Sequence, residues 1–418
     1  MKILLLGLNY APEPIGIGPY TTGLVEALAA RGHEVRAVVG NAYYPHWRPW
    51  PGQRGWSTEA AGRIRIDRVP HYIPRQPRGL ARLAHHLSFA LAAAPVMVRH
   101  ALLWRPDQVI TIAPSLMAAP LALLAAKISG ATSWLHVQDF EVEAALATGL
   151  LGKGNPLVPM LGRTERGILC AFDRVSSISP AMCRRISGKG VADEKISERR
   201  NWTNIDAVTP LARPSSFREK WRITTPHVAL YSGALGRKQG LDLVVDAARD
   251  LAHREDITFV ICGNGPYRAD LEAMAVGLSN IRFHHLQPLD QMTELLGLAT
   301  VHLLPQIAGA ADLVLPSKLP NMLASGRPVI ATASEGTGLF DEVMGCGLTV
   351  APGDATALGT AIAQLCDNPA LARNLGEAAR TRAEMRWHRE TILSGFVGAI
   401  EAAHVRPRVG SLVRELAP

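Results

Sequence analysis

Short apolar runs alternate with helix-like stretches along the whole chain of 418 residues. Ten of these runs read as strands, over residues 2–7, 34–40, 108–113, 133–138, 174–179, 227–233, 257–263, 281–286, 300–305 and 327–332. Stretches with helical periodicity, such as 21–32, lie between them. This alternation is typical of parallel sheets joined by crossover helices. The pattern therefore predicts an α/β protein with two Rossmann-like, doubly wound domains that face each other across a cleft.

A proline-rich stretch without periodicity, residues 204–216, is the expected joint between the two domains. We place the first domain at 1–207 and the second at 208–385. Residues 386–418 form a predicted helical segment that could cross back to the first domain. Ligands of such sheets usually bind at the carboxyl ends of the strands, so the turns that follow the strands are the first places to search.

Charge and cysteine usage narrow the class of partner and the compartment. The 44 basic residues outnumber the 36 acidic ones and give a net charge of +8, which favours an anionic partner. The five cysteines are scattered singly without a CxxC pair, which argues against zinc and disulfide frameworks and favours a reducing compartment. The opening run "MKILLLG" is too short for a signal sequence and reads better as a buried strand. We therefore expect a cytoplasmic protein.

Two glycine turns follow strands of the second half. "SGALGRKQGLDL" carries Gly233, Arg237 and Lys238, and "CGNGP" places Gly263 after the next strand. A turn that only reverses the chain needs no cations, whereas a lysine and an arginine among glycines suit a phosphate group. Solvated surface cations are the alternative for Arg237 and Lys238, and "CGNGP" could be an ordinary turn.

A similar turn follows the first strand of the chain. Gly16 and Gly18 precede a helical stretch, where small residues let a ligand approach the backbone and free amides carry the positive end of the helix dipole. The spacing does not match the GxGxxG dinucleotide fingerprint, because Thr21 occupies the position of the third glycine. The alternative is a flexible loop before a helix.

Residues 75–107 combine cations with a long apolar face. On a helical projection Arg75, Arg78, Arg82 and His86 share one side, and Leu80, Leu83, Leu87, Leu91 and Ala94 share the other. One interpretation is a helix packed on a sheet with a solvated cationic edge. The other is a contact with the inner membrane surface that admits a lipid-linked acceptor, joined by Trp47, Trp50 and Trp56 unless these pack on each other. Nucleic-acid binding is disfavoured because the cations are dispersed rather than gathered with stacking aromatics.

The most specific stretch of the chain is "ADLVLPSKLPNMLASGRPVIATASEGTG" (311–338). Together with "RGHEV" (31–35), "YSGALGRKQGLDL" (231–243), "ICGNGP" (261–266) and "VAPGD" (350–354), it resembles glycosyltransferase family 4. "YYPHW" (43–47), "NWTN" (201–204) and "PSKLPNMLASGRPVIAT" (316–332) resemble its bacterial exopolysaccharide branch, which includes the colanic acid fucosyltransferase type.

The resemblance implies a GT-B fold and retaining transfer of a hexosyl or deoxyhexosyl group. It implies a GDP- or UDP-linked sugar donor, held mainly by the second domain, and a glycan or lipid-diphosphate-linked acceptor in exopolysaccharide, capsule or O-antigen synthesis. It also implies no cofactor and no required metal. In agreement, the sequence has no DxD motif that resembles a metal-binding site.

The resemblance also assigns donor-binding residues. Lys238 matches the lysine of a basic pair that holds the diphosphate, while Ala234 stands where the arginine of that pair is usual. Many members carry two glutamates separated by seven residues. Here Asn321 falls near the second glutamate and Asp312 near the first, although the spacing does not match. Between them in the sequence, Ser317 and Lys318 belong to the "PSK" signature of the branch, and a surface lysine at a helix start is the alternative for Lys318.

The strand over 133–138 carries the candidate catalytic groups of the first domain. Asp139 matches the aspartate that follows this strand in the branch, and we expect it to act as a base or to orient the acceptor. A cap for the helix that follows is the alternative. His136 lies inside the apolar strand, where a core histidine and a catalytic one are both open interpretations.

Two other functions remain open at this point. A nucleotide-sugar 2-epimerase shares the two-domain plan and needs no acceptor. A non-catalytic glycan- or lipid-binding scaffold would also fit a chain that lacks the glutamate pair.

Overall fold

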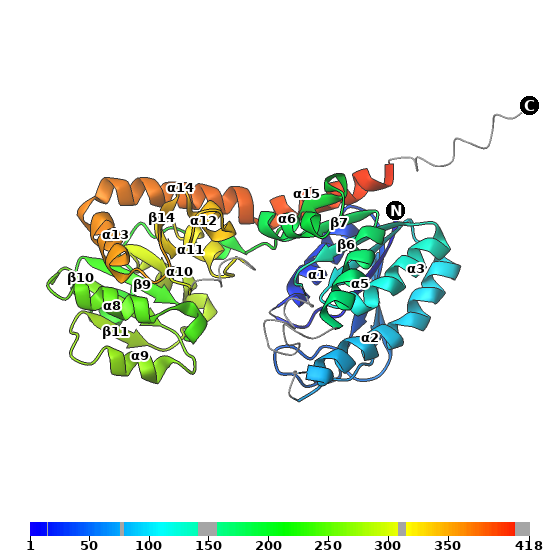
Figure 1. Cartoon of the computed structure of the whole chain (residues 1–418), viewed down its shortest axis with the longest axis horizontal. Helices are drawn as coiled ribbons and strands as arrows, with labels where there is room; N and C mark the ends of the chain where they lie inside the picture. The colour runs from blue at the N-terminus through cyan, green and yellow to red at the C-terminus, as the bar shows by residue number, and fades with distance from the viewer. Residues whose placement is uncertain (15, 76–78, 141–156, 308–314, 406–418) are drawn as a thin grey trace, which may run out of the picture. The chain divides into compact units, whose positions relative to one another are not determined.

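The computed structural model describes residues 1–14, 16–75, 79–140, 157–307 and 315–405 (Figure 1). The chain forms two compact units. Met1–Asn201 and the described residues from Leu393 make the first unit, and Trp202–Ile392 makes the second. The units therefore divide six residues before the expected boundary at 207, and the chain returns to the first unit seven residues after the expected start of the last segment at 386.

The first unit is built on an eight-stranded sheet with the order β3-β4-β2-β1-β5-β6-β7-β8. Its strands are β1 (Lys2–Gly7), β2 (Glu34–Gly40), β3 (Ser57–Ala61), β4 (Ile64–Val69), β5 (Gln108–Ala113), β6 (Thr132–Val137), β7 (Arg174–Ser177) and β8 (Ile196–Glu198). All neighbouring strands are parallel except β3 and β4. The parallel strands direct their carboxyl ends to one edge of the sheet.

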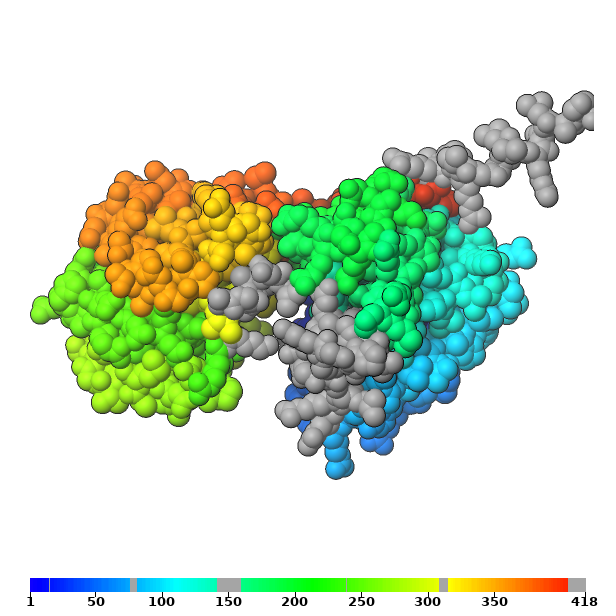
Figure 2. Space-filling view, viewed as in Figure 1, coloured from blue at the N-terminus to red at the C-terminus, as the bar shows by residue number. Residues whose placement is uncertain are grey.

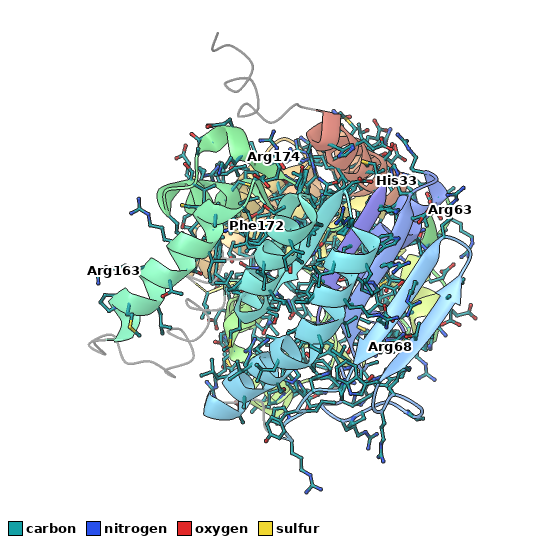
Figure 3. All side chains as sticks on the ribbon, turned by 90° about the vertical axis from the view of Figure 1, so that its right-hand side faces the viewer. His33, Arg63, Arg68, Arg163, Phe172 and Arg174 are labelled. Carbon is teal, nitrogen blue, oxygen red and sulfur yellow. The ribbon has the colours of Figure 1, made fainter. Side chains whose placement is uncertain are left out.

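Helices cover both faces of this sheet. They are α1 (Gly18–Ala30), α2 (Gly79–Arg99), α3 (Ala119–Ser129), α5 (Leu157–Ala171), α6 (Pro180–Gly188) and α15 (Arg389–Val405). Helices α2, α3 and α5 lie side by side on one face (Figure 3). Helix α2 continues directly into a π-helical turn, His100–Trp104.

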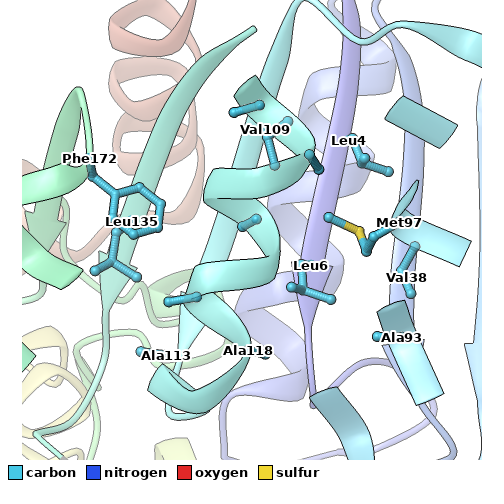
Figure 4. Packing of buried hydrophobic residues seen from close by; sticks show 14 of the residues in the cluster. Leu4, Leu6, Val38, Ala93, Met97, Val109, Ala113, Ala118, Leu135 and Phe172 are labelled. Carbon is cyan, nitrogen blue, oxygen red and sulfur yellow. The ribbon is translucent and has the colours of Figure 1, made fainter. Parts of the chain in front are cut away.

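Side chains along each strand point alternately to the two faces of the sheet, and this alternation explains the core of the unit. Leu4 and Leu6 of β1 point to the same face and join the cluster that contains Met97 of α2 (Figure 4). Ile3 and Leu5 point to the opposite face and are equally buried. The central strand β1 is therefore apolar on both faces, as a parallel sheet covered by helices requires.

The second unit is built on a six-stranded, fully parallel sheet with the order β11-β10-β9-β12-β13-β14. Its strands are β9 (His227–Ser232), β10 (Ile257–Cys262), β11 (Ile281–His284), β12 (Val301–Leu304), β13 (Val329–Thr332) and β14 (Gly347–Val350). Its helices are α7 (Phe217–Lys220), α8 (Asp242–Asp250), α9 (Arg268–Met274), α10 (Met292–Gly297), α11 (Leu319–Ala324), α12 (Gly338–Val343), α13 (Ala355–Asp367) and α14 (Pro369–Trp387).

The fold confirms the predicted class of two parallel-sheet α/β domains. All ten predicted strands are present, with ends that differ by up to two residues. The pattern missed β3, β4, β8 and β14. These strands lie at or near the edges of the sheets. β3 is exposed throughout, β8 has three residues and β14 is half-buried, while two of the four buried residues of β4 are the charged Asp67 and Arg68. The five cysteines are free.

Candidate functional site

The turns after β9 and β10 are joined through their backbones. The amide of Gly233 donates to the carbonyl of Cys262 at 3.0 Å, and the amide of Leu235 donates to the carbonyl of Asn264 at 2.9 Å. A Cβ atom on Gly263 would lie 1.9 Å from the carbonyl oxygen of Gly233, so only glycine fits there. The two predicted glycine turns therefore form one backbone platform at the carboxyl ends of neighbouring strands.

Lys318 approaches this platform from the start of α11. Its Nζ lies 3.7 Å from the ring centroid of Tyr231, the penultimate residue of β9. A Cβ atom on Gly233, whose φ is +141°, would lie 3.6 Å from the same Nζ. The structure thus brings together the two predicted residues Gly233 and Lys318, and adds Tyr231, which sequence reasoning missed.

The ammonium group of Lys318 has an unusual environment. The residue is partly exposed along its length, but its Nζ is buried and has no hydrogen-bond partner in the described part of the chain. Burial lowers the pKa of Lys318 to about 7, while the face of the Tyr231 ring favours the charged form. A buried ammonium without a partner is costly, and a strongly shifted pKa at the carboxyl ends of parallel strands marks a candidate anion site.

Arg237 already has partners in this structure. It lies in a short 3₁₀ turn, Arg237–Gln239, and its guanidinium pairs with Asp270 at 3.1 Å and stacks on the Tyr267 ring at 4.4 Å. Its side chain is 78% exposed. This environment fits the surface interpretation of Arg237 better than the phosphate-binding one. The backbone of Lys238 belongs to the same turn, and its side chain lies outside the part of the chain that the structure describes.

The "PSK" segment leads into α11. Ser317 is exposed in the turn before the helix, and Asn321 is half-buried in the first turn of the helix. The carbonyl of Asn321 accepts the amide of Ser325 at 3.1 Å, so its backbone belongs to the helix. Asp312 lies outside the described residues. Within this group, Lys318 is the residue whose side chain lies against the glycine platform.

In the first unit, the loop before α1 is tightly packed. Gly16 has a φ of +76°, and Gly18 is the first residue of α1. A Cβ atom on Gly18 would lie 2.9 Å from the Cβ of Glu13, and one on Gly16 would lie 3.0 Å from the Tyr44 ring. The two glycines therefore allow close approach, here by side chains of the same unit.

Glu13 organises this loop and was missed by sequence reasoning. Its Oε1 accepts the amides of Tyr43 and Tyr44 at 2.9 Å each, and its Oε2 accepts the side-chain amide of Asn9 at 2.9 Å. The residue is buried, and burial raises the pKa of its carboxyl group. The clue in the sequence is an acidic residue between two prolines in "APEPIGIG", just before the glycines.

His136 is held on both sides of its ring. Its Nδ1 lies 2.9 Å from the hydroxyl of Ser176, and its Nε2 lies 3.1 Å from the side-chain amide of Gln138. Burial lowers the pKa of His136 to about 3, which keeps the ring neutral. These contacts fit the core-histidine interpretation, in which the ring positions the end of β6.

Asp139 follows β6 at the carboxyl edge of the first sheet. It is half-buried, and its Oδ1 accepts the amide of Phe140 at 2.8 Å. The helix that it was expected to cap lies outside the described residues. Beside it, Gln138 and Asn201 form a reciprocal amide pair at 2.7 and 2.9 Å. This pair fixes the first residue of the "NWTN" motif next to the end of β6.

Two further features help to delimit the site. In the described ranges, no three His, Cys, Asp or Glu side chains gather closely enough to hold a metal ion.

A cavity of about 680 Å³ lies at the amino end of the second sheet, where Arg218, His227 and Arg327 are among its lining residues. It contains none of the predicted site residues, and ligands of parallel sheets bind at the other end of the strands. We therefore centre the site on Lys318.

Comparisons with known proteins match each unit to a glycosyltransferase family. Residues 16–202 match the family described as glycosyl transferase 4-like domain, and residues 214–382 match glycosyl transferases group 1. The chain is 39% identical over 412 residues to the putative colanic acid biosynthesis glycosyl transferase WcaI of Escherichia coli strain K12, a match that covers 96% of this chain and 100% of that protein.

Solved structures show the same fold at low sequence identity. Sucrose-phosphate synthase from Thermosynechococcus elongatus is similar with a TM-score of 0.69 and 20% identity, over 96% of this chain and 98% of that one. Anabaena Alr3699/HepE in complex with UDP is similar with a TM-score of 0.68 and 15% identity, over 96% of this chain and 100% of that one. This likeness is one of fold.

Proposed function

Because the chain belongs to glycosyltransferase family 4, whose members share the GT-B fold, we propose that it transfers a hexosyl or deoxyhexosyl group from a nucleotide-sugar donor with retention of configuration. The proposed acceptor is a glycan linked to a lipid diphosphate, in exopolysaccharide, capsule or O-antigen synthesis. The name of the Escherichia coli relative supports this range of products. The observation that carries the proposal is the buried ammonium of Lys318 at the carboxyl ends of the second sheet.

The donor diphosphate is the natural partner for this ammonium. Transfer breaks the anomeric C–O bond while negative charge grows on the departing diphosphate. A fixed cation in a low-dielectric setting stabilises such charge more effectively than one in water. Lys318, Lys238 and the amides of the platform around Gly233 and Gly263 are the groups we assign to this task. A GDP- or UDP-linked sugar fits this assignment, and Asn321 is our candidate for a ribose hydroxyl.

The acceptor side of the reaction is assigned to the first unit. The acceptor hydroxyl must approach the anomeric carbon and lose its proton. We propose Asp139 as the residue that orients this hydroxyl or takes its proton, and we place His136 behind it as a positioning residue. In a front-face route the departing phosphate takes the proton instead, and retention then needs no enzymic nucleophile.

We propose that the reaction requires no metal and no cofactor beyond the donor, since the lysines named above supply the positive charge. We also propose a cytoplasmic location at the inner face of the membrane, where nucleotide sugars and lipid-linked glycans can meet. Both points extend the family resemblance and the basic composition of the chain.

A transfer assay tests the function directly. The full chain is incubated with radiolabelled UDP- and GDP-sugars and a bacterial lipid extract, with and without EDTA. Label that moves to the lipid fraction, in an α-linkage from an α-linked donor and in the presence of EDTA, is the expected result. A changed free nucleotide sugar without transfer would indicate the epimerase alternative. Donor binding without turnover would indicate the scaffold alternative.

A further inference from the structure

Helix α2 and the π-helical turn after it pack on the first sheet through one fully buried apolar stripe. Phe89, Ala93, Met97 and Ala101 follow one another at four-residue spacing, and all are fully buried in the core. Ala93 and Met97 lie against the sheet beside Leu6 (Figure 4). Ala90, Ala92 and Val96 beside this stripe pack partly against the same core, and the side of the helix opposite the stripe faces outward.

Three of the leucines predicted from the sequence to share the other side lie on that outward face, and the side chain of Leu80 lies outside the described part of the chain. Leu83, Leu87 and Leu91 are 50%, 44% and 67% exposed, and Pro95, one step further, is exposed as well. They are offset by two residues from the buried stripe, or about 200° around the helix at 100° per residue. The helix is therefore apolar on two opposite sides, and only one side is covered by the unit.

Neighbouring elements extend this apolar surface. The π-helical turn after α2 exposes Leu102 and Leu103, which are 54% and 78% exposed. Helix α3 packs beside α2 and this turn, and exposes Leu124 and Ile128. We call this surface the leucine face; it comprises Leu83, Leu87, Leu91, Leu102, Leu103, Leu124 and Ile128. The elements that carry it lie at the surface of the first unit in blue to cyan (Figure 2).

The exposed charges within the segments that carry the leucine face have one sign. Between residues 69 and 138 the only acidic residue is Asp107, whereas the basic residues there are Arg75, Arg78, Arg82, Arg99, Arg105 and Lys127. Asp107 is engaged inside the unit, where its carboxylate accepts the amide of Lys2 at 2.7 Å. Arg99, Arg105 and Lys127 are exposed. Exposed leucines among exposed cations, without acidic neighbours in sequence, match the chemistry of an anionic lipid surface.

We propose that the leucine face docks the first unit onto an anionic bilayer, with the leucines at the boundary of the acyl chains and the cations among the headgroups. This inference deepens the proposed function, because it brings the enzyme to the surface that holds a lipid-linked acceptor. Trp47 and Trp50 do not take part. Trp47 packs on Tyr43 at 5.1 Å between ring centroids, and the indole of Trp50 donates to the carbonyl of Tyr44.

Two other occupants are less compatible with these observations. A second copy of the chain would bring the same cations against themselves in a symmetric contact, and like charges at an interface are unfavourable. A membrane-spanning role for 81–104, which is long and apolar enough by composition, would require its buried stripe and the buried His85 and His86 to leave the core. Lying on the bilayer keeps the sheet intact.

Vesicle flotation tests the inference without nucleotide sugar or acceptor, so its outcome is independent of transferase activity. The full chain is mixed with vesicles of phosphatidylglycerol and phosphatidylcholine, or of phosphatidylcholine alone. Binding to the anionic vesicles is expected, and it should weaken as salt is raised. Partitioning onto the anionic vesicles should fall at least about tenfold in the variant Leu87→Gln/Leu91→Gln/Leu103→Gln. In the variant Arg105→Gln/Lys127→Gln it should fall about fivefold for each cation removed.

The matched control is Leu286→Gln/Leu289→Gln, which removes two leucines of the second unit that are 58% and 82% exposed. This control should bind vesicles like the wild type. Equal loss in the control and the triple variant would overturn the proposal, as would wild-type binding by the triple variant or no binding of the wild type to anionic vesicles. A dimer that dissociates in the triple variant would assign the face to a second copy instead. Circular dichroism of each variant checks that it is folded.

Discussion

We expect Lys318 to destabilise the folded chain when no anion is bound, because its ammonium is buried without a hydrogen-bond partner among the described residues. Replacement by the apolar, similarly shaped methionine should therefore raise stability, by about 1–3 kcal/mol. Thermal or urea unfolding at pH 7 measures this change. Lys220→Met is the control: this exposed lysine of the same unit donates to Gln287 and Gln291 at 3.2 and 3.4 Å, so its loss should lower stability by at most about 1 kcal/mol. A Lys318→Met variant less stable than the wild type would show that the lysine has a structural role.

The stability gain of Lys318→Met should depend on pH with a definite sign. The folded-state pKa of Lys318 is about 7, below its ordinary value of 10.5. Between these values the unfolded chain holds a proton that the folded chain lacks, so the stability of the wild type rises with pH across this window. The advantage of the variant should be full below pH 7 and should shrink as pH rises toward 10. Urea titrations at pH 6 and pH 9 measure it, and a constant difference would contradict the shifted pKa.

Asp139 provides the test of the acceptor side. Asp139→Asn should lower kcat by about 10²-fold and leave donor affinity unchanged, because a general base acts on the reacting proton and not on the diphosphate. Steady-state kinetics with a separate titration of the donor resolves the two effects. Asp193→Asn, at an exposed position of the same unit, is the matched control. An unchanged kcat would remove Asp139 from the mechanism.

For single residues, the sequence predicted which side chains belong to the candidate site better than it predicted what they contact. Lys318 follows from the branch signature, but its contact with Tyr231 depends on a segment almost ninety residues earlier in the chain. Arg237 is equally visible in the sequence, yet Asp270 and Tyr267, which engage it, belong to another turn and helix. Such pairings are set by the packing of elements, and local pattern does not specify them.

At the level of secondary-structure elements, the proposed donor site depends on the two hydrogen-bonded turns after β9 and β10. Gly263→Ala should destabilise the second unit by about 1–3 kcal/mol, since its methyl group would overlap the carbonyl of Gly233. Donor binding should weaken with it. Gly359→Ala places a methyl group in ordinary contact within α13 and should not destabilise the unit. Chemical denaturation of both variants makes the comparison, and equal stabilities would contradict the close approach.

Element prediction succeeded where burial is continuous. The central strands β1, β5, β9 and β10 are nearly all buried and appear in the sequence as apolar runs. The hairpin strand β3 is exposed at every residue, so no hydrophobic pattern marks it. The outward leucines of α2 were visible as a stripe, but only the structure shows that the core uses a different stripe of the same helix.

For the whole molecule, the two-unit plan was predictable but its boundaries were not. The chain returns to the first unit at Leu393, where Phe396 packs on Trp134 with 5.7 Å between ring centroids. Further along α15, Glu401 pairs with His33 at 2.9 Å. These contacts join residues more than 260 positions apart. Prolines and local periodicity therefore do not indicate them.

Nucleotide binding should affect the two units unequally. With the diphosphate at about 100 times its Kd, the most protected amides of the second unit should exchange up to about 100-fold more slowly, since binding to the folded state adds about 2.7 kcal/mol. Hydrogen exchange followed by mass spectrometry locates this effect. The turn at 231–239 and the segment at 315–322 should respond most. Protection confined to the first unit would contradict the assignment of the donor to the second.

In the proposed mechanism, Lys318 and the glycine platform of the second unit hold the diphosphate of a nucleotide sugar. Calorimetric titration of UDP and GDP into the wild type, Lys318→Met and the Lys220→Met control measures this role. One of the two nucleotides should bind the wild type and the control alike, and it should bind Lys318→Met about 10–100-fold more weakly, as expected for the loss of a charge-assisted contact. Equal affinity for the wild type and Lys318→Met, or no binding of either nucleotide to the wild type, would contradict the assignment.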